Sequence, residues 1–145
     1  MHDKEFEFDF ERLKIYHKAL DFIDKIFDIY RKLPSEFKYS VGNNLIRAGL
    51  SIANNIAEGN GKKSKKEKNR YFGTSLDSAR ECVSVLNVLK RQKLIDDEKY
   101  FELRNDGREI TSMLYGLISS TETRAQKPGE FYEVKSKGLS VLWSL

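Results

Sequence analysis

The chain has 145 residues, of which 39% are hydrophobic and 33% are charged, and its formal net charge at pH 7 is +4. This length fits a single domain with its own core, and the composition excludes a disordered chain and a membrane protein. No apolar run approaches the roughly 20 residues that cross a bilayer, and the N-terminus does not resemble a secretory signal. The lone cysteine, Cys82, cannot form an internal disulfide. We therefore expect a cytoplasmic protein.

Charge is unevenly distributed along the chain. Residues 1–11 hold five acidic side chains and one lysine, a local net charge of −4, whereas residues 62–70 have a local net charge of +5. The basic side chains of the second segment form what we call the lysine cluster: Lys62, Lys63, Lys65, Lys66, Lys68 and Arg70. The basic excess of the protein is thus concentrated in one short segment.

The first predicted helix spans residues 13–33 and ends at Pro34. Its apolar residues recur every three or four positions in two interleaved series, which is the period of an α-helix. Together the series cover roughly 200° of the helix surface, more than one core contact requires. We expect burial on two sides, one within the subunit and one against a neighbour. The series are Leu13, Tyr16, Leu20, Ile23, Phe27 and Tyr30, and Ile15, Ala19, Phe22, Ile26, Ile29 and Leu33.

The polar stripe of this helix carries His17, Asp21, Asp24 and Asp28 among lysines. Such a stripe could hold a hard cation. We favour a solvated face, in which ion pairs between residues four apart on the helix account for the charges.

The second predicted helix runs from about Val41 to Glu58, and Gly59 is expected to close it in the left-handed conformation that glycine favours. Small side chains along it should let another helix approach closely. They are Ala48, Gly49, Ser51, Ala53 and Ala57.

The third helix is predicted to open at Ser64, because Ser64 followed by Glu67 forms a capping-box pattern. The fourth begins near residue 97, with Asp96 as the N-cap, and ends before Pro128 and Gly129. The connections fall at 34–40, 59–64 and 93–96. Four amphipathic helices with such short connections predict an all-α fold, an antiparallel up-and-down four-helix bundle.

Three parts of the chain are expected: an acidic N-terminal segment (1–10), the bundle (11–125) and a C-terminal tail (126–145). The tail is too apolar for a solvated end, so it should dock on the bundle, mediate association or bind a partner. Its apolar residues are Phe131, Tyr132, Leu139, Val141, Leu142, Trp143 and Leu145.

The segments "LSIANNIAEGNG" and "YFGTSLDSARE" resemble a family of four-helix-bundle proteins encoded in intervening sequences of bacterial large-subunit ribosomal RNA genes. The motif positions here are Ser51, Ile52, Asn55, Ile56, Ala57, Glu58, Gly59, Ser78 and Glu81. Ala53 replaces the proline of that family's motif and Asp77 replaces a glycine, so the second helix should be straighter than usual. The match covers about residues 10–123.

The resemblance implies a ring-like homopentamer, and the double-sided first helix agrees with it. It also implies kinship with the accessory protein of diversity-generating retroelements, which works with a reverse transcriptase and nucleic acid. The resemblance to the broader family implies a fold and an assembly, and it does not imply a particular activity.

The lysine cluster is the candidate binding site. Lys65 and Lys66 fall in the first turn of the third helix, where each cation opposes the helix dipole by about 0.3–1 kcal/mol. Free N–H groups at a helix start, flanked by ammonium groups, form a phosphate site. The alternatives are a solvated loop and pairing with acidic residues 3–11 of the same or a neighbouring subunit. Tyr71 and Phe72, which follow the cluster, are expected in the core.

For the remaining polar residues of the motif, a structural role is favoured over a catalytic or metal-binding one. Asn55 and Glu58 should form a polar network near the start of the third helix, with Ser78 and Glu81 on that helix. Glu58 and Glu81 could instead serve as metal ligands or as acid and base, but no histidine has the spacing of di-iron bundles. Cys82 should be a small buried hydrophobe. We expect no catalytic residues, no metal and no cofactor.

These observations predict a non-enzymatic oligomeric protein that binds nucleic acid, with RNA favoured, through phosphate contacts that do not read sequence. The alternative is a protein-interaction scaffold that docks a partner such as a reverse transcriptase or another polymerase.

Overall fold

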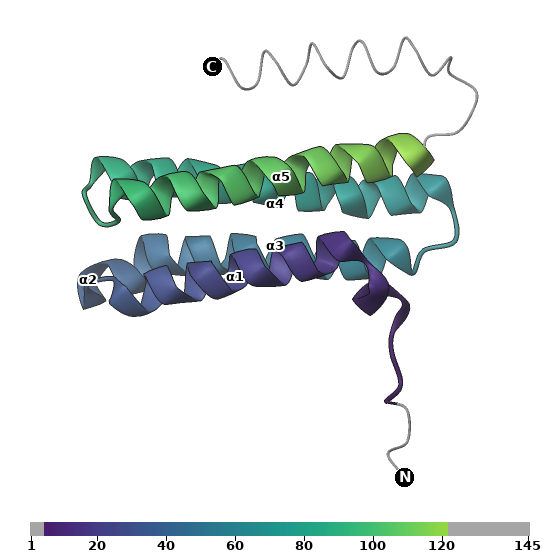
Figure 1. The fold of residues 1–145 in the computed structure, drawn as a ribbon, viewed down its shortest axis with the longest axis horizontal. Coiled ribbons are helices and arrows are strands. Elements are labelled where there is room, and N and C mark those ends of the chain that lie inside the picture. The colour runs from purple at the N-terminus through teal and green to yellow at the C-terminus, as the bar shows by residue number, and fades with distance from the viewer. Residues whose placement is uncertain (1–4, 122–145) are drawn as a thin grey trace.

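The computed structural model describes residues 5–121, which form an all-helical fold (Figure 1). Two of the shorter elements differ from α-helix: η1 is a 3-10 helix and η2 is a π-helix. The described residues contain no strand. In chain order the elements are η1 (Asp9–Arg12), α1 (Lys14–Lys32), α2 (Ser35–Phe37), η2 (Lys38–Gly42), α3 (Asn43–Asn60), α4 (Lys65–Arg91) and α5 (Asp97–Thr121).

The four long helices lie side by side, and the connections between consecutive ones fall at alternating ends of the bundle (Figure 1). Helix α3 packs against α4 and α1, and α5 packs against α4 and α1. The start of α1 and the α3–α4 connection therefore lie at the same end, opposite α2. Within the described residues, no helix is long and apolar enough to cross a membrane.

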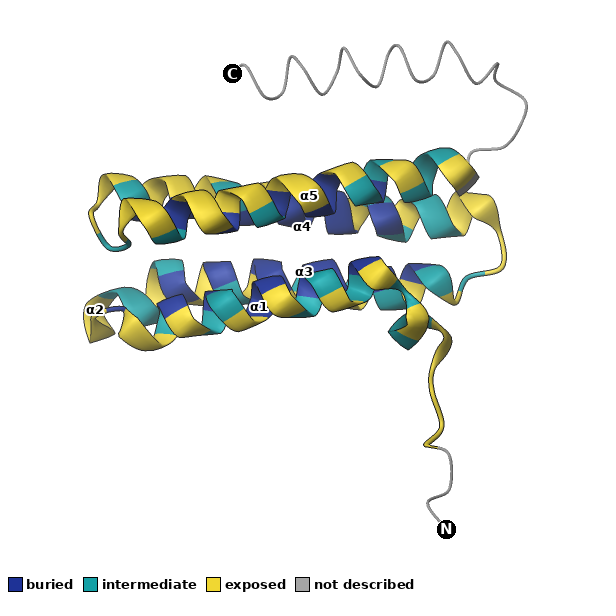
Figure 2. Ribbon diagram, viewed as in Figure 1, coloured by how far each residue is buried: buried dark blue, intermediate teal, exposed yellow. Residues whose placement is uncertain are grey.

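Buried residues lie on the sides of the helices that face one another (Figure 2). The core is aliphatic, with the rings of Phe22 and Phe72 fully enclosed. Burial of this apolar surface is the main stabilising contribution to such a fold. The largest enclosed side chains besides these rings are Ile26, Leu45, Ile52, Ile56, Leu86, Leu89, Leu103, Ile110 and Leu114.

The two apolar series of α1 have different environments. The series that starts at Ile15 is buried throughout, as expected for a core face. The series that starts at Leu13 is half-buried, except for Ile23, which is buried. The burial of α1 within the subunit is therefore as expected. The side of α1 expected to contact a neighbouring subunit is only partly covered in a single chain.

The second predicted helix begins earlier than expected. The connection predicted at 34–40 is helical from Ser35 onward, because α2 and the π-helix η2 lead directly into α3. The backbone passes close to α1 there, since a Cβ on Gly42 would lie 3.0 Å from Cδ2 of Tyr30. The sequence of this segment did not predict these helical turns. They occur where the chain makes a tight contact with α1.

Gly59 does not have the predicted left-handed conformation. No glycine in the described chain has a positive φ, and Gly59 lies inside α3, which ends at Asn60. Its role is close packing: a Cβ there would lie 2.8 Å from Cε1 of Phe72 and 2.9 Å from Cβ of Tyr71. Gly49 has a similar role against α1, where a Cβ would lie 2.9 Å from Cδ1 of Ile26. The prediction that small residues let helices approach is confirmed, and the prediction for Gly59 is wrong.

The predicted starts of the third and fourth helices are confirmed. The Ser64 hydroxyl accepts a hydrogen bond from the Glu67 N–H at 3.1 Å, which is one half of the capping box. The Glu67 carboxylate pairs with Arg70 at 3.6 Å. At α5 the Asp96 carboxylate accepts from the Lys99 N–H at 2.7 Å. The predicted end of this helix near Pro128 and the whole tail (126–145) lie outside the described residues.

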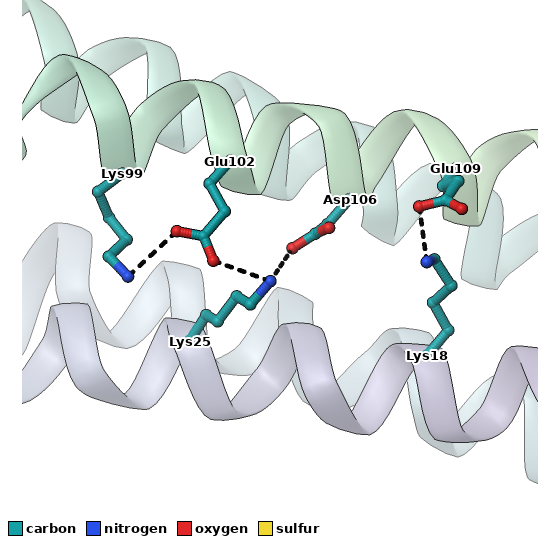
Figure 3. A network of polar contacts seen from close by, with 6 residues as sticks. All are labelled: Lys18, Lys25, Lys99, Glu102, Asp106 and Glu109. Carbon is teal, nitrogen blue, oxygen red and sulfur yellow. Dashed lines mark hydrogen bonds and ion pairs between the residues drawn. The ribbon is translucent and has the colours of Figure 1, made fainter.

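Ion pairs join α1 to α5 along one side of the bundle (Figure 3). The Lys25 ammonium lies 2.6 Å from Asp106 and 3.0 Å from Glu102, and Lys18 lies 2.6 Å from Glu109. The hydrogen bond to Asp106 is the main reason that the pKa of Lys25 is raised, and the bond from Lys25 likewise lowers the pKa of Glu102. The expectation of ion pairs within the polar stripe of α1 is therefore wrong for Lys18 and Lys25, which pair between helices.

Candidate nucleic-acid interface

The lysine cluster occupies the turn between α3 and α4 and the first turns of α4. The turn is fixed by backbone hydrogen bonds, since the N–H groups of Gly61 and Lys62 donate to the carbonyls of Glu58 and Gly59, each at 3.2 Å. The Ser64 cap then sets the direction of α4. Two firmly closed helix ends thus hold the cluster at one end of the bundle.

Three of the six cations are held in place by neighbours. The Lys68 ammonium donates to the Asn60 carbonyl at 2.8 Å, which places a cation at the C-terminal end of α3, where the dipole favours it. The Lys62 ammonium lies 5.1 Å from the Tyr71 ring centroid, and the Arg70 guanidinium lies 4.6 Å from it. Cation–π contacts of this kind are worth about 0.5–1 kcal/mol at exposed sites.

The other three cations are exposed. Lys63, Lys65 and Lys66 form no ion pair or side-chain hydrogen bond with any residue of the described chain. The N–H groups of Lys65 and Lys66 belong to the first turn of α4, where no intrahelical carbonyl can accept from them. The ammonium groups and these N–H groups all present positive charge to solvent, so this end of α4 favours an anion.

Tyr71 is a member of the site that the sequence reading missed. It was expected in the core with Phe72, but only Phe72 is buried, and Tyr71 is half-buried with cations from both sides of the turn around its ring. The signal that could have identified it is its position directly after Arg70, at the boundary between the basic run and the apolar face. Tyr71 joins the start of α4 to the turn that precedes it.

An acidic segment lies at the same end of the bundle. We call residues 5–11 the acidic arm. Its Asp9 carboxylate accepts a hydrogen bond from the Asn60 side chain at 2.5 Å, directly beside the lysine cluster. Its Glu7 pairs with Arg12 at 3.2 Å. Within residues 5–121, no ion pair joins the arm to the cluster, so pairing of the two stays a prediction.

A polar seam joins α3 to α4 farther along the bundle. The hydroxyls of Ser51 and Ser78 lie 2.7 Å apart, and the Asn55 amide donates to the Ser51 hydroxyl at 3.0 Å and to the Ser51 carbonyl at 2.8 Å. The buried Ser75 hydroxyl donates to the Ile52 carbonyl at 2.8 Å. The prediction that Asn55 reaches the start of the third helix is therefore wrong, because its amide binds Ser51 within this seam. Hydrogen bonding of this kind satisfies polar groups where two helices pack closely.

The two glutamates of the motif do not belong to this seam. Glu58 and Glu81 are both exposed, and neither side-chain carboxylate forms a hydrogen bond or ion pair with another described residue. Among residues 5–121, no group of three or more metal-ligating side chains is close enough to hold an ion. Cys82 is fully buried, and burial raises the pKa of its thiol to about 12. The thiol therefore stays protonated at neutral pH.

A second surface feature lies on α3. Side chains of this helix line a shallow depression of about 620 Å³. It contains Leu50, which is 41% exposed, together with amides and one arginine. The lining residues are Asn43, Ile46, Arg47, Leu50, Ser51, Asn54 and Asn55.

Comparison with known proteins agrees with this architecture. A family model described as 23S rRNA-intervening sequence protein matches residues 11–116. A solved structure from Bacteroides thetaiotaomicron, a protein with unknown function from the S23 ribosomal protein family, is 28% identical to this chain. The similarity covers 72% of this chain and 97% of that one, with a TM-score of 0.68. No curated protein matches the sequence.

Proposed function

Because the chain belongs to the 23S rRNA-intervening sequence protein family, we propose that it is a non-enzymatic, cytoplasmic protein that binds nucleic acid through its lysine cluster. We take structured RNA as the first ligand, since the family is described by its link to 23S rRNA. The proposed subunit is an antiparallel up-and-down bundle, and the proposed assembly is a ring-like homopentamer.

The observation that carries this proposal is the exposure of Lys63, Lys65 and Lys66. Lys65 and Lys66 oppose the dipole of α4, and none of the three has an ion-pair partner in the described chain. Acidic side chains would stabilise this turn, as Asp97 and Glu98 do at the start of α5. A bound phosphate group would compensate for the unfavourable placement, because it accepts from both the ammonium groups and the free N–H groups.

The chemistry of the cluster favours contact with the phosphate backbone over reading of bases. Lysine presents a compact charge without the planar donor pairs that recognise base edges. Arg70, which has such donors, is engaged by Glu67 and by the Tyr71 ring. The proposed binding is therefore independent of sequence and sensitive to salt.

The test removes the three exposed cations together. The variant Lys63→Gln, Lys65→Gln, Lys66→Gln should lose at least tenfold in affinity for duplex RNA at low salt. A matched variant, Lys32→Gln, Arg80→Gln, Arg104→Gln, removes the same charge from exposed positions away from this end of the bundle. Binding is measured by filter retention. Equal loss in the two variants, or no binding by the unmodified protein at low salt, would contradict the proposal.

The half-buried series of α1 supports the proposed pentamer. Ordinary solvated helix faces are polar, whereas this one carries aliphatic and aromatic side chains that pack at the margin of the core and are only half-buried. A ring of subunits would also bring several copies of the lysine cluster together, so weak single contacts would add up to firm binding.

The depression on α3 supports the alternative function, a scaffold that docks another protein such as a polymerase. Its exposed Leu50 and its mixture of amides with one arginine resemble the composition of protein interfaces more than that of a solvated face. The test is capture of a partner protein from cell extract. A partner that stays bound after nuclease treatment, but is not captured by the Leu50→Arg variant, would favour this function over RNA binding.

A further inference from the structure

We propose that the acidic arm competes with nucleic acid for the lysine cluster of its own chain, an inference that rests on the proposed function. The arm has the sequence EFEFDFE and a local net charge of −4, against +5 for residues 62–70. The two segments are far apart in sequence but lie at the same end of the bundle (Figure 1).

Asn60 is the point at which the arm and the cluster meet. Its side-chain amide donates to the Asp9 carboxylate at 2.5 Å, and its carbonyl accepts from the Lys68 ammonium at 2.8 Å. A single asparagine thus separates a carboxylate of the arm from an ammonium of the cluster. Because both groups contact the same residue, the charges of the arm and of the cluster act on each other across Asn60.

The arm also has the right chemistry for a competitor. Its rings form a series: Phe6 packs edge-on to Phe8 at 5.1 Å between centroids, and Phe8 stacks on Phe10 at 5.6 Å. Phe6 is 78% exposed and Phe8 is 53% exposed, and the carboxylates between them face solvent. Anionic groups alternating with stacked rings are also what a single-stranded nucleic acid offers to a basic surface.

The base of the arm is anchored while its outer part projects away from the bundle (Figure 1). The anchors are η1, the Asp9 contact with Asn60, and the packing of Phe10 against Tyr16 at 4.9 Å between centroids. In the free protein the carboxylates lower the positive potential of the cluster. A polyanion with several contiguous phosphates displaces the arm, and a short or weakly charged one does not.

The first test neutralises the arm. The variant Glu5→Gln, Glu7→Gln, Asp9→Asn should bind duplex RNA about three- to tenfold more tightly than the unmodified protein at low salt, and the gain should shrink as salt rises. A control variant, Asp21→Asn, Asp24→Asn, Glu36→Gln, makes the same change in net charge on α1 and on α2, at the opposite end of the bundle. Its expected gain is below about twofold. Equal gains in both variants, or none in the arm variant, would overturn the inference.

The second test needs no RNA. A carbodiimide joins contacting carboxylates and amines directly, and peptide mass spectrometry locates the products. We expect links from Glu5, Glu7 or Asp9 to lysines of the cluster, lost when RNA is added. Mixed isotopic labelling should show that they form within one chain. Absence of such links overturns the inference even if RNA binds, whereas RNA binding by no variant overturns the proposed function itself.

Discussion

Gly59 occupies a place in α3 where side chains of α4 leave no space for a Cβ. The Phe72 ring and the Cβ of Tyr71 lie against it, and a glycine that follows a helical pattern has the same signature as a helix-ending glycine. Both situations require the absence of a Cβ, so the sequence could show that the position needed glycine and could not show why. Only the contact with α4 distinguishes them.

Replacement of Gly59 by alanine should therefore destabilise the protein by about 1–3 kcal/mol, because the added methyl group collides with two aromatic side chains. Gly73→Ala is the control. It adds the same group to a helical position with nothing within 4 Å, and it should stabilise by up to about 1 kcal/mol. Urea denaturation at one protein concentration measures both. A Gly59→Ala protein as stable as the unmodified one would contradict this account.

Among the helices, periodicity and capping predicted the long elements well because these signals are local. The starts of α4 and α5 follow from Ser64 and Asp96, whose side chains cap the helices as expected. The helical turns at 35–42 were missed because no local apolar period indicates them. The pairing of α1 with α5 was missed for a related reason: a lysine on a polar stripe carries no sign of which helix its partner lies on.

The ion pairs between α1 and α5 predict a specific pH dependence of stability. Glu102 has a lowered pKa in the folded protein, so its contribution is present above the ordinary value of 4.5 and is lost as the pH falls through the folded value. Lys25 has a raised pKa, so its contribution is present below 10.5 and is lost as the pH rises through the folded value. The pairing should stabilise the fold between these limits.

The variant Lys25→Gln should accordingly lose stability at pH 7, and the difference from the unmodified protein should shrink at pH 3. Lys14→Gln removes an exposed lysine that has no ion-pair partner among the described residues, and it should show no such change with pH. Thermal unfolding across this range provides the comparison. A Lys25→Gln difference that is the same at pH 3 and pH 7 would exclude these ion pairs as its cause.

At the scale of the whole molecule, the sequence indicated the candidate site only in part. The lysine cluster is visible as a run of charge, because all six cations lie within nine residues. The hydrogen bond from Asn60 to Asp9 joins residues 51 positions apart, so no local pattern could indicate it. The same holds for the cations on either side of Tyr71, which depend on how the turn folds back on α4.

The partly covered side of α1 leads to a prediction about assembly. We expect a sedimentation mass near five times the monomer mass of 16.9 kDa at micromolar concentration. A charged residue on the half-buried series, as in Leu20→Glu, should shift the protein toward monomer, whereas Asp21→Asn on the neighbouring exposed face should not. A monomeric mass for the unmodified protein would refute the pentamer.

The most direct test of the central claim is the salt dependence of RNA binding. For the unmodified protein, a plot of log affinity against log salt should be steep, with a slope of about −0.9 for each phosphate contact in a duplex. The variant Lys63→Gln, Lys65→Gln, Lys66→Gln should have a slope shallower by about 2 to 3 per binding subunit, because up to three contacts are lost. If instead the slopes of the two proteins are equal, the lysine cluster does not meet phosphate.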